Sequence, residues 1–346
     1  MNERLLMAAS WTLRRLFFER RPLPPNPRAV LYIQLDHIGD ALLAEPALAS
    51  LRAHYPRARL DVLCARWNRA VFENSPHVQR ILEFNPRVFR RDGRPPDSAF
   101  KTWRAFKALR GEYAVSMCIR GSWTALALAK GCWFDRGADR LEMKRRRQNP
   151  PDHAADAALQ MLASRGVPTE SRPPRFYFTQ EQDASAALLL KGVLKKIGGE
   201  ERQAVALHVG SPVRAKRWPT AKFASLAERL YAEGMAPILI GARGEADLTA
   251  ETAKTARVPA ADLSGRTTLG ELGALLSRCA GFVGNDSAPM HIAAAVGLPA
   301  LGLFFVSDPL RFGPRGERAD YLQAPSPHAL DAGAAMEALL RLMKQP

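Results

Sequence analysis

Short apolar runs separated by amphipathic segments fill the first half of this chain. The runs predict buried strands over residues 29–35, 60–64, 78–84 and 113–119, and the segments between them predict helices over 40–54 and 100–110. Strands that alternate with helices are typical of parallel βαβ units. We therefore expect an α/β protein with a doubly wound parallel sheet.

The same alternation begins again after the Pro-containing stretch 172–175. A long helix is predicted over 181–197; it is followed by strands over 203–208, 237–241, 280–283 and 300–305 and by helices over 221–233, 246–255, 268–279 and 292–296. A chain of 346 residues is too long for one ordinary core, and two domains of roughly 150 residues each are expected. Two successive Rossmann-like domains predict a ligand cleft at their interface.

The charge balance of the chain points to anionic partners. Lys and Arg number 50 against 34 Asp and Glu, which gives a formal net charge of +16. Nucleic acid, an anionic membrane face and phosphorylated substrates all fit such a charge. The basic residues are dispersed and no nucleic-acid-reading module is recognisable, so we expect no nucleic-acid partner. The four cysteines form no Cys-x-x-Cys pair, which is typical of a reducing cytosol.

The first residues predict a basic amphipathic helix followed by a Pro-rich linker, and we assign residues 1–27 to this part. Arg14 and Arg15 follow the apolar stretch 5–13 without a small-residue cleavage site, so a signal peptide is not expected. No apolar run is long enough to span a bilayer. The helix either lies in a membrane interface or packs on its own protein, and the sequence favours neither.

Four groups of polar residues follow predicted strands, at the sheet edge where α/β folds bind ligands. In the first group, 35–40, Gly39 permits a tight turn and Asp40 opens the next helix. Asp40 either caps that helix or serves as a general base for a hydroxyl group.

The second group, 208–219, carries three cations before a helix, Arg214, Lys216 and Arg217. It is not a Walker A loop, since no Gly precedes Lys216 and no Ser or Thr follows it. The cations either belong to a solvated loop or neutralise a diphosphate leaving group. In the third group, 241–245, Glu245 lies where acidic residues bind ribose hydroxyls in nucleotide folds.

The fourth group, Gly284-Asn-Asp-Ser-Ala-Pro-Met-His291, joins a strand to a helix. With Ser287 at the N-cap, the free backbone N–H groups and the helix dipole form an anion site. His291 falls one turn inside the helix, so we expect it to face an open cleft and reach the same anion. A capped helix with ordinary surface side chains is the alternative.

Several well-known signatures are absent from the sequence: G-x-G-x-x-G, His-Glu-x-x-His, G-x-S-x-G and Asp-x-Asp. NAD-dependent redox chemistry, zinc hydrolysis, serine hydrolysis and metal-dependent sugar transfer therefore lose support.

Taken together, these groups resemble glycosyltransferase family nine, the ADP-heptose:lipopolysaccharide heptosyltransferases. The matching motifs run in the family's order and spacing and cover nearly all of 29–314; they are 35–46 (Leu-Asp-His-Ile-Gly-Asp-Ala-Leu-Leu-Ala-Glu-Pro), 208–211 (His-Val-Gly-Ser) with 216–219 (Lys-Arg-Trp-Pro), 241–245, 263–269 and 284–291. Ala288 stands where the family commonly has Gly, and Val209 where it commonly has Pro. Neither departure touches a charged group; the one at Ala288 bears on which sugar the donor carries.

The resemblance implies a GT-B fold, with an acceptor-binding Rossmann-like domain over 28–175 and a nucleotide-sugar-binding one over 176–325 that face a cleft. It implies that segment 326–346 returns to pack on the first domain. Asp40 matches the general base and Lys216 the cation on the donor phosphates, and both are implied to be catalytic. The other donor-binding residues implied are His208, Gly210, Ser211, Glu245, Asp286, Ser287, Ala288 and His291, and the acceptor-binding residues are Asp36, Gly39 and Arg120.

Members of this family are inverting enzymes that need neither a metal nor another cofactor. The implied reaction moves heptose from ADP-heptose to the inner core of lipopolysaccharide or a related acceptor. The implied partners are the nucleotide sugar, a lipid-linked phosphorylated or acidic oligosaccharide, and the anionic inner membrane of a bacterium, on whose cytoplasmic face the protein is expected to lie peripherally. The alternatives are a family member with another nucleotide sugar or acceptor, and a non-catalytic sugar-binding or membrane-binding homologue.

Overall fold

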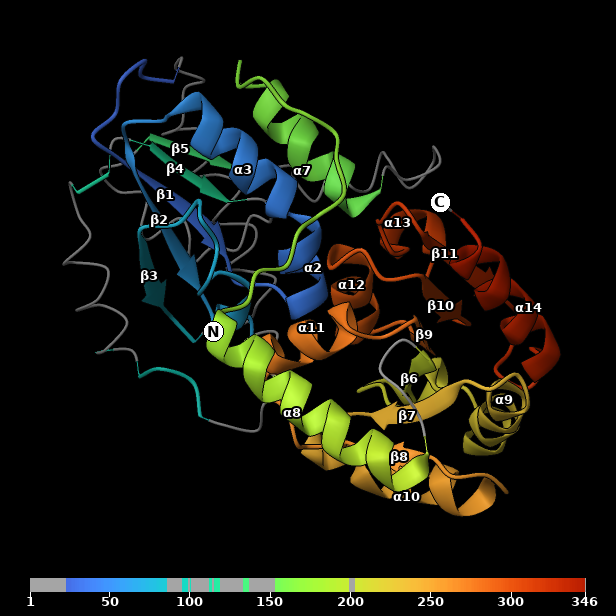
Figure 1. Cartoon of the computed structure of the whole chain (residues 1–346). Helices are drawn as coiled ribbons and strands as arrows, with labels where there is room; N and C mark the ends of the chain where they lie inside the picture. The colour runs from blue at the N-terminus through green and yellow to red at the C-terminus, as the bar shows by residue number, and fades with distance from the viewer. Residues whose placement is uncertain are drawn as a thin grey trace. The chain divides into compact units, whose positions relative to one another are not determined.

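Each of the two units of the chain, Met1–Arg172 and Pro173–Pro346, is built on one parallel sheet (Figure 1). The computed structural model describes residues 23–85, 95–98, 100, 112–113, 115–118, 133–136, 153–198 and 203–345. The predicted N-terminal helix, nearly all of the predicted helix 100–110 and Arg120 lie outside the described residues. The sequence places the domain boundary after residue 175, and the structure places it after residue 172.

The sheet of the first unit has five parallel strands in the order β3-β2-β1-β4-β5. Its central strand, β1 (Ala29–Gln34), is buried throughout and leads directly into the first predicted site loop. The other strands are β2 (Arg59–Cys64), β3 (Arg80–Glu83), β4 (Val115–Cys118) and β5 (Trp133–Arg136). This strand order confirms the predicted doubly wound α/β architecture.

Three helices of the first unit pack together: α2 (Ile38–Leu43), α3 (Glu45–His54) and α7 (Ala154–Ala163) (Figure 1). The single helix predicted over 40–54 is therefore two helices that meet at Ala44. Pro46 explains the break, because it has no N–H to donate and its ring clashes with the carbonyl four residues earlier. In the first turn of α3 this proline is harmless, since that turn has no N–H bond to lose.

The sheet of the second unit has six parallel strands in the order β11-β10-β9-β6-β7-β8. Four of them correspond to predicted runs, β6 (Ala204–His208), β7 (Ala236–Ile240), β9 (Gly281–Asn285) and β10 (Ala300–Phe304). The edge strands β8 (Ala261–Asp262) and β11 (Ala319–Gln323) are missed by the sequence pattern. One has only two residues and the other is only partly buried, so neither produces an apolar run.

Helices cover both faces of the second sheet (Figure 1). One group of neighbours consists of α9 (Thr220–Ala232), α10 (Ala246–Thr255) and α14 (Ala332–Met343), and the other of α8 (Gln180–Ile197), α11 (Leu269–Ser277) and α12 (Ala288–Ala295). The remaining described helical turns are η1 (Arg69–Val71), η3 (Arg214–Lys216), η4 (Arg243–Glu245) and α13 (Pro309–Phe312). Among the described helices, none combines the length and the apolar content that crossing a membrane requires.

The C-terminal helix α14 is part of the core of the second unit. The resemblance implies that segment 326–346 packs on the first domain, and that contact stays a prediction. Its apolar stripe, which includes Ala335, Leu339 and Leu342, packs against α9, β9 and β10. Gly281 in β9 admits this helix, since a Cβ there would lie 3.0 Å from Leu339 Cδ1. A stripe of this spacing predicts a helix that buries one face but does not identify the surface that covers it.

Candidate active site

The carboxyl ends of β6 and β9 lie side by side in the centre of the second sheet. Strands β7 and β8 extend the sheet on one side of this pair, and β10 and β11 extend it on the other. Doubly wound sheets bind ligands at such a reversal of strand order. The second and fourth predicted groups follow β6 and β9, so the fold brings together residues that are 70 positions apart, such as Lys216 and Asp286.

Lys216 and Asp286 form an ion pair, with Lys216 Nζ 2.5 Å from Asp286 Oδ2. Ser307, which follows β10, donates its hydroxyl to the same carboxylate oxygen. The Asp286 side chain is 7% exposed, whereas that of Lys216 is 26% exposed. The carboxylate thus fixes the ammonium at the sheet edge. Sequence reasoning missed Ser307, although its place just after the predicted strand 300–305 was an available signal.

Asn285 ties the two loops together and is fully buried. Its Nδ2 donates to the carbonyl oxygens of Val209 at 3.0 Å and Gly210 at 3.1 Å. Its Oδ1 accepts the backbone N–H of Trp218 at 2.8 Å, and the Trp218 side chain is itself buried. These bonds fix both ends of segment 208–219, whereas Pro212, Arg214 and Ala215 in its middle are exposed. The sequence places Asn285 inside a motif but assigns it no role.

Helix α12 begins beside this ion pair with Ser287 at its N-cap position, as predicted. The Ser287 hydroxyl does not cap the helix; it lies 3.0 Å from His208 Nδ1 and 3.2 Å from the carbonyl oxygen of Asn285. Among the described residues, none accepts a hydrogen bond from the backbone N–H of Ser287 or Ala288. Free N–H groups at the positive end of a helix dipole suit an anion.

His208, at the end of β6, is buried between Ser287 and Glu245. Its Nε2 lies 3.3 Å from Glu245 Oε2, which also accepts the backbone N–H of Ala242 at 2.8 Å. Burial alone raises the pKa of Glu245, but the hydrogen bond and charge of His208, the Ala242 N–H and the charge of Arg217 together outweigh burial and lower this pKa. Glu245 is therefore an ionised carboxylate at neutral pH, suited to accept hydrogen bonds from ligand hydroxyls.

Gly210 and Ser211 shape the loop that follows β6 and are both buried. A Cβ at Gly210 would overlap the Glu245 carboxylate, so the absence of a side chain lets this acid approach the backbone. The Ser211 hydroxyl accepts the N–H of Val213 at 3.3 Å, and the Ser211 carbonyl accepts Arg217 Nε at 2.7 Å. Ser211 thus has a clear part in the loop's shape, while its contact with a donor stays a prediction.

His291 is 6% exposed, so the prediction that it faces an open cleft is wrong. It is the fourth residue of α12, whose residues from Met290 to Ala295 are all buried. The helix packs against β9, β10 and α11 at once, which leaves little of its circumference open. A smaller residue at this position is expected to leave a cavity. The contact of His291 with a donor stays a prediction.

Residues of the segment that follows β2 hold the loop after β1 in place by hydrogen bonds. The Asp36 carbonyl accepts Trp67 Nε1 at 2.9 Å and Asn68 Nδ2 at 2.8 Å, and Asn68 also donates to the carbonyl of Gln34 at 3.1 Å. Asp36 and Asn68 are both buried. Sequence reasoning missed Trp67 and Asn68, because they lie about thirty residues from the loop that they hold.

Asp40 lies in the first turn of α2, and the N-cap position belongs to His37. Gly39 and Asp40 are both half-buried at the carboxyl end of β1, beside the point where the strand order of the first sheet reverses between β1 and β4. This is the edge at which such sheets bind ligands. Arg120, the third expected acceptor residue, lies outside the described residues, so its contact stays a prediction.

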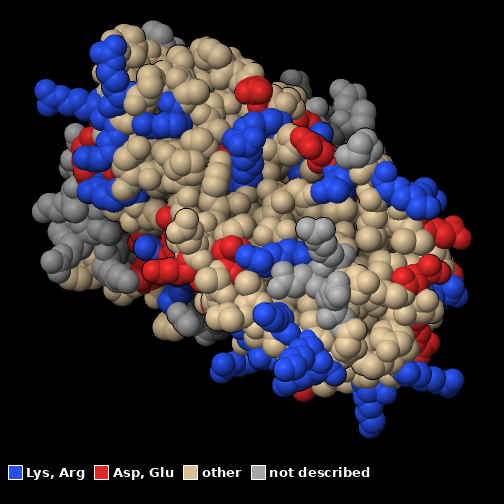
Figure 2. Space-filling view, viewed as in Figure 1, with Lys and Arg blue, Asp and Glu red and all other residues tan. Residues whose placement is uncertain are grey.

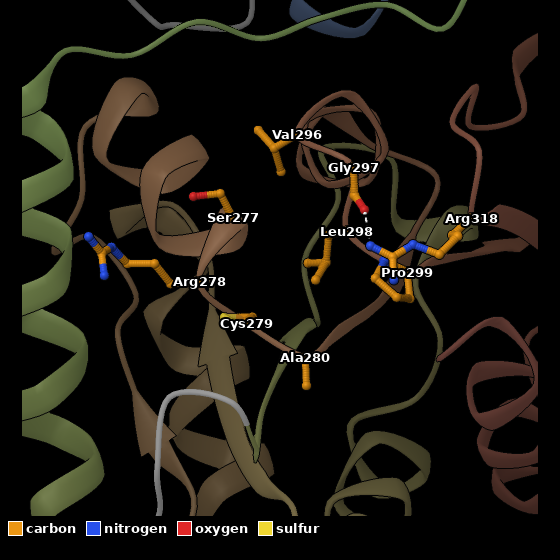
Figure 3. A pocket seen from close by; sticks show the side chains of 9 residues that line it. All are labelled: Ser277, Arg278, Cys279, Ala280, Val296, Gly297, Leu298, Pro299 and Arg318. Atoms are coloured by element: carbon orange, nitrogen blue, oxygen red, sulfur yellow. Dashed lines mark hydrogen bonds between the residues drawn. The ribbon is translucent and has the colours of Figure 1, made fainter. Parts of the chain in front are cut away.

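A hollow of about 510 Å³ lies at the opposite edge of the second sheet, between the loops that precede β9 and β10 (Figure 3). Arg318 lines it and donates to the carbonyl of Gly297 at 2.8 Å. Arg278 also lines it and is paired with Asp183 of α8 at 2.8 Å. Both guanidinium groups hold structural elements together, and the hollow lies apart from the residues described above.

Comparison with known proteins identifies the family. The model of glycosyltransferase family 9 (heptosyltransferase) matches residues 104–336. The chain belongs to this family. Lipooligosaccharide heptosyltransferase 2 of Haemophilus influenzae is 24% identical to it over 312 residues, which cover 85% of this chain and 88% of the relative. Lipopolysaccharide heptosyltransferase 3 of Escherichia coli is 24% identical over 299 residues, which cover 80% and 83%.

Solved structures share the fold of this family 9 member. A family 9 glycosyltransferase from Veillonella parvula matches with a TM-score of 0.79 at 18% identity, covering 94% of this chain and 99% of its own. The ADP-heptose lipopolysaccharide heptosyltransferase II of E. coli matches with a TM-score of 0.71 at 20% identity, covering 91% and 98%. The predicted GT-B fold of two Rossmann-like parallel-sheet domains is thereby confirmed, and family membership makes the chain a glycosyltransferase, as predicted.

In this glycosyltransferase, Gly210→Ala is expected to weaken ADP binding by about ten- to a hundredfold and to lower the free energy of unfolding by about 1–3 kcal/mol. The added methyl group displaces the Glu245 carboxylate, which then loses its hydrogen bonds with buried His208 and with the Ala242 N–H. Calorimetric titration with ADP and thermal unfolding measure the two effects. The matched control is Gly192→Ala in α8, where nothing lies within 4 Å of the added Cβ. Equal ADP affinity in both variants would show that Glu245 does not contact the nucleotide.

Proposed function

We propose that this glycosyltransferase is an inverting, metal-independent enzyme that moves heptose from ADP-heptose to the inner core of lipopolysaccharide or a related acceptor. The observation that carries the proposal is the convergence of Lys216, the free N–H groups of α12 and the Glu245 carboxylate at one sheet edge. The sugar is supported by the relatives, which are named heptosyltransferases. The donor is supported by the E. coli structure, whose name includes ADP-heptose.

In the proposed donor site, the diphosphate lies at the start of α12. The backbone N–H groups of Ser287 and Ala288 donate to its oxygens, and Lys216 meets the negative charge that grows on ADP as its bond to the anomeric carbon breaks. Glu245 accepts hydrogen bonds from the ribose. Its Oε1 is suited to this, because the hydrogen bonds that Glu245 makes to described residues all reach Oε2.

In the proposed transfer step, Asp40 accepts the proton of an acceptor hydroxyl. The hydroxyl oxygen forms a bond to the anomeric carbon, the bond from that carbon to the phosphate oxygen breaks, and ADP leaves with the electron pair. Attack from the side opposite to ADP inverts the anomeric configuration. Asp36 and Gly39 shape the acceptor side of the loop, and Arg120 supplies a cation for an acidic or phosphorylated acceptor.

A donor panel tests this proposal. The full chain is incubated with heptose-free lipopolysaccharide core and with ADP-heptose, ADP-glucose, UDP-glucose or GDP-mannose; ADP release and the mass of the product are followed. Product is expected with ADP-heptose. Faster transfer from another donor would replace the sugar in the proposal. ADP binding without turnover of any donor would favour a non-catalytic homologue. Binding of DNA or RNA in a filter assay, weakened by added salt, would favour a nucleic-acid-binding protein.

The same assay in EDTA tests metal independence. No three His, Cys, Asp or Glu side chains within the described ranges form a group that could hold a metal ion, and Lys216 with the start of α12 can meet the charge that a metal would otherwise stabilise. Equal rates with and without EDTA are expected. A rate lost in EDTA and restored by magnesium or manganese would contradict this part of the proposal.

We further propose that the protein works peripherally on the cytoplasmic face of the inner membrane. Its net charge of +16 suits an anionic surface. On the face shown in Figure 2, Lys and Arg side chains are scattered rather than gathered in one stripe. This favours the basic helix that the sequence predicts within 1–27 as the membrane contact.

Deletion of residues 1–21 is therefore expected to lower binding to anionic vesicles while sparing turnover on a soluble, truncated acceptor. Vesicle sedimentation and steady-state kinetics measure the two quantities, with neutral vesicles as the control. Unaltered vesicle binding, or loss of the folded protein, would instead indicate a helix that packs on its own protein.

A further inference from the structure

Three loops of the second unit meet at the carboxylate of Asp286. Asp286 follows β9, Lys216 lies in the loop after β6, and Ser307 lies in the loop after β10. Lys216 Nζ and the Ser307 hydroxyl both donate to the same oxygen, Asp286 Oδ2. The Asp286 side chain is only 7% exposed, so its charge depends on these donors more than on water. Asp286 is thus shared between a cation of the proposed donor site and a neutral hydroxyl.

Backbone structure holds Ser307 beside this carboxylate. The N–H of Asp286 donates to the Leu303 carbonyl of β10 at 3.1 Å, so the segments that follow β9 and β10 leave the sheet next to each other. On the far side of Ser307, Asp308 caps α13 by accepting the N–H of Leu310 at 3.0 Å. These bonds do not involve η3, so the place of the Ser307 hydroxyl is set independently of that turn.

Lys216 is placed differently, because its charge stands at the end of a long side chain that is 26% exposed. An ammonium group has three hydrogens, and in the free protein one of them faces Asp286 Oδ2. In the proposed reaction, negative charge grows on ADP and draws the ammonium toward the phosphates. Such a shift weakens the pair with Asp286, and a buried carboxylate oxygen that loses its donor costs free energy. Ser307 is the donor that the described residues leave at that oxygen.

We propose that Ser307 is a positioning residue whose hydroxyl keeps Asp286 Oδ2 hydrogen-bonded while Lys216 shifts its ammonium from that carboxylate to the diphosphate of the departing ADP. The proposal rests on the proposed function, because it needs a diphosphate within reach of Lys216. In this role Ser307 acts through Asp286 and needs no contact with the donor. Without the Ser307 hydroxyl, Asp286 Oδ2 keeps Lys216 as its one partner within the described ranges, and the ammonium is less available to the leaving group.

Ser307→Ala tests this in a single-turnover assay of the full chain with ADP-heptose and heptose-free lipopolysaccharide core. The rate of heptose transfer is expected to fall about tenfold, the usual effect of one hydrogen bond to a charged group. The affinity for ADP-heptose should change less than about threefold, because the charge on ADP grows only as its bond to the sugar breaks. Ser307→Thr keeps the hydroxyl and should restore the rate. The matched control is Ser185→Ala, which removes a hydroxyl that donates to Glu271 Oε1 at 2.6 Å between α8 and α11 and should leave the rate unchanged.

A second background separates this role from a general effect on the fold. Lys216→Met has no ammonium to release, so adding Ser307→Ala to it should slow transfer by less than about twofold. Losses of the same size in both backgrounds, a normal rate in Ser307→Ala, or a slow rate in folded Ser307→Thr would overturn the role of Ser307. If Ser307→Ala fails to fold, Ser307→Cys takes its place, since a thiol is only a weak donor. Absence of transfer from ADP-heptose by the unaltered protein would instead overturn the proposed function.

Discussion

Replacement of Asp40 by Asn is expected to lower kcat/KM for heptose transfer by roughly a hundredfold to ten-thousandfold. Asn keeps the size of the side chain but cannot accept the proton of the acceptor hydroxyl. The position lies in the first turn of α2 and is half-buried, so the exchange leaves no cavity. ADP affinity should not change, because the proposed nucleotide site belongs to the second unit. Steady-state kinetics, ADP titration and thermal unfolding separate the three quantities.

The matched control for this exchange is Glu73→Gln in the same unit. Glu73 is 41% exposed and pairs with Arg69, and loss of such a surface pair should alter kcat/KM by less than about twofold. If Asp40→Asn keeps near-full turnover, Asp40 serves only the start of α2, and the proposed general base is wrong.

Replacement of Lys216 by Met is expected to reduce kcat by roughly a hundredfold to a thousandfold, the usual cost of removing a group that stabilises charge in the transition state. The ion pair with Asp286 also gives this exchange an effect on the stability of the free protein. Without Lys216, the Ser307 hydroxyl is the one hydrogen-bond partner that the described residues leave to Asp286 Oδ2. The free energy of unfolding should therefore fall by about 1–3 kcal/mol.

A second substitution separates the two effects of Lys216. Lys216→Met combined with Asp286→Asn removes the unpaired charge, so the double variant should recover much of the stability and none of the activity. Lys254→Met, at an exposed lysine of α10, is the control and should change neither quantity. Normal turnover in Lys216→Met would exclude Lys216 from the transfer step, and recovery of turnover in the double variant would assign it a structural role alone.

The positions of the main strands follow from local pattern. Strands such as β6 and β9 are buried on both faces, so nearly every residue in them is apolar and the run is visible without knowledge of the fold. The edge strand β11 is only partly buried, and its sequence, Ala-Asp-Tyr-Leu-Gln, shows neither an apolar run nor a strict alternation. The break at Pro46 was readable from the sequence, because proline cannot continue α2 whatever surrounds it.

In the candidate site, too, some features follow from local sequence pattern and others depend on tertiary packing. Polar groups that directly follow apolar runs predict which loops carry chemistry, since parallel strands end at one edge of their sheet. Whether a side chain in those loops faces outward depends on packing from every side. His291 was placed at the correct turn of α12 and on the wrong surface, because α11 and two strands close over that helix.

By itself, the sequence determined the order of the central strands and the main helices of the second unit, the two Rossmann-like domains and the family, because each of these depends on residues close together in the chain. Only the tertiary structure decided that α14 belongs to the second unit, that Asp286 pairs with Lys216 and that His208 joins Ser287 to Glu245. These contacts join residues from 37 to 79 positions apart or bury a helix among strands far away in the chain. The spacing of residues along the chain does not give the distances between such groups in space. The order of the strands in the sheet sets those distances.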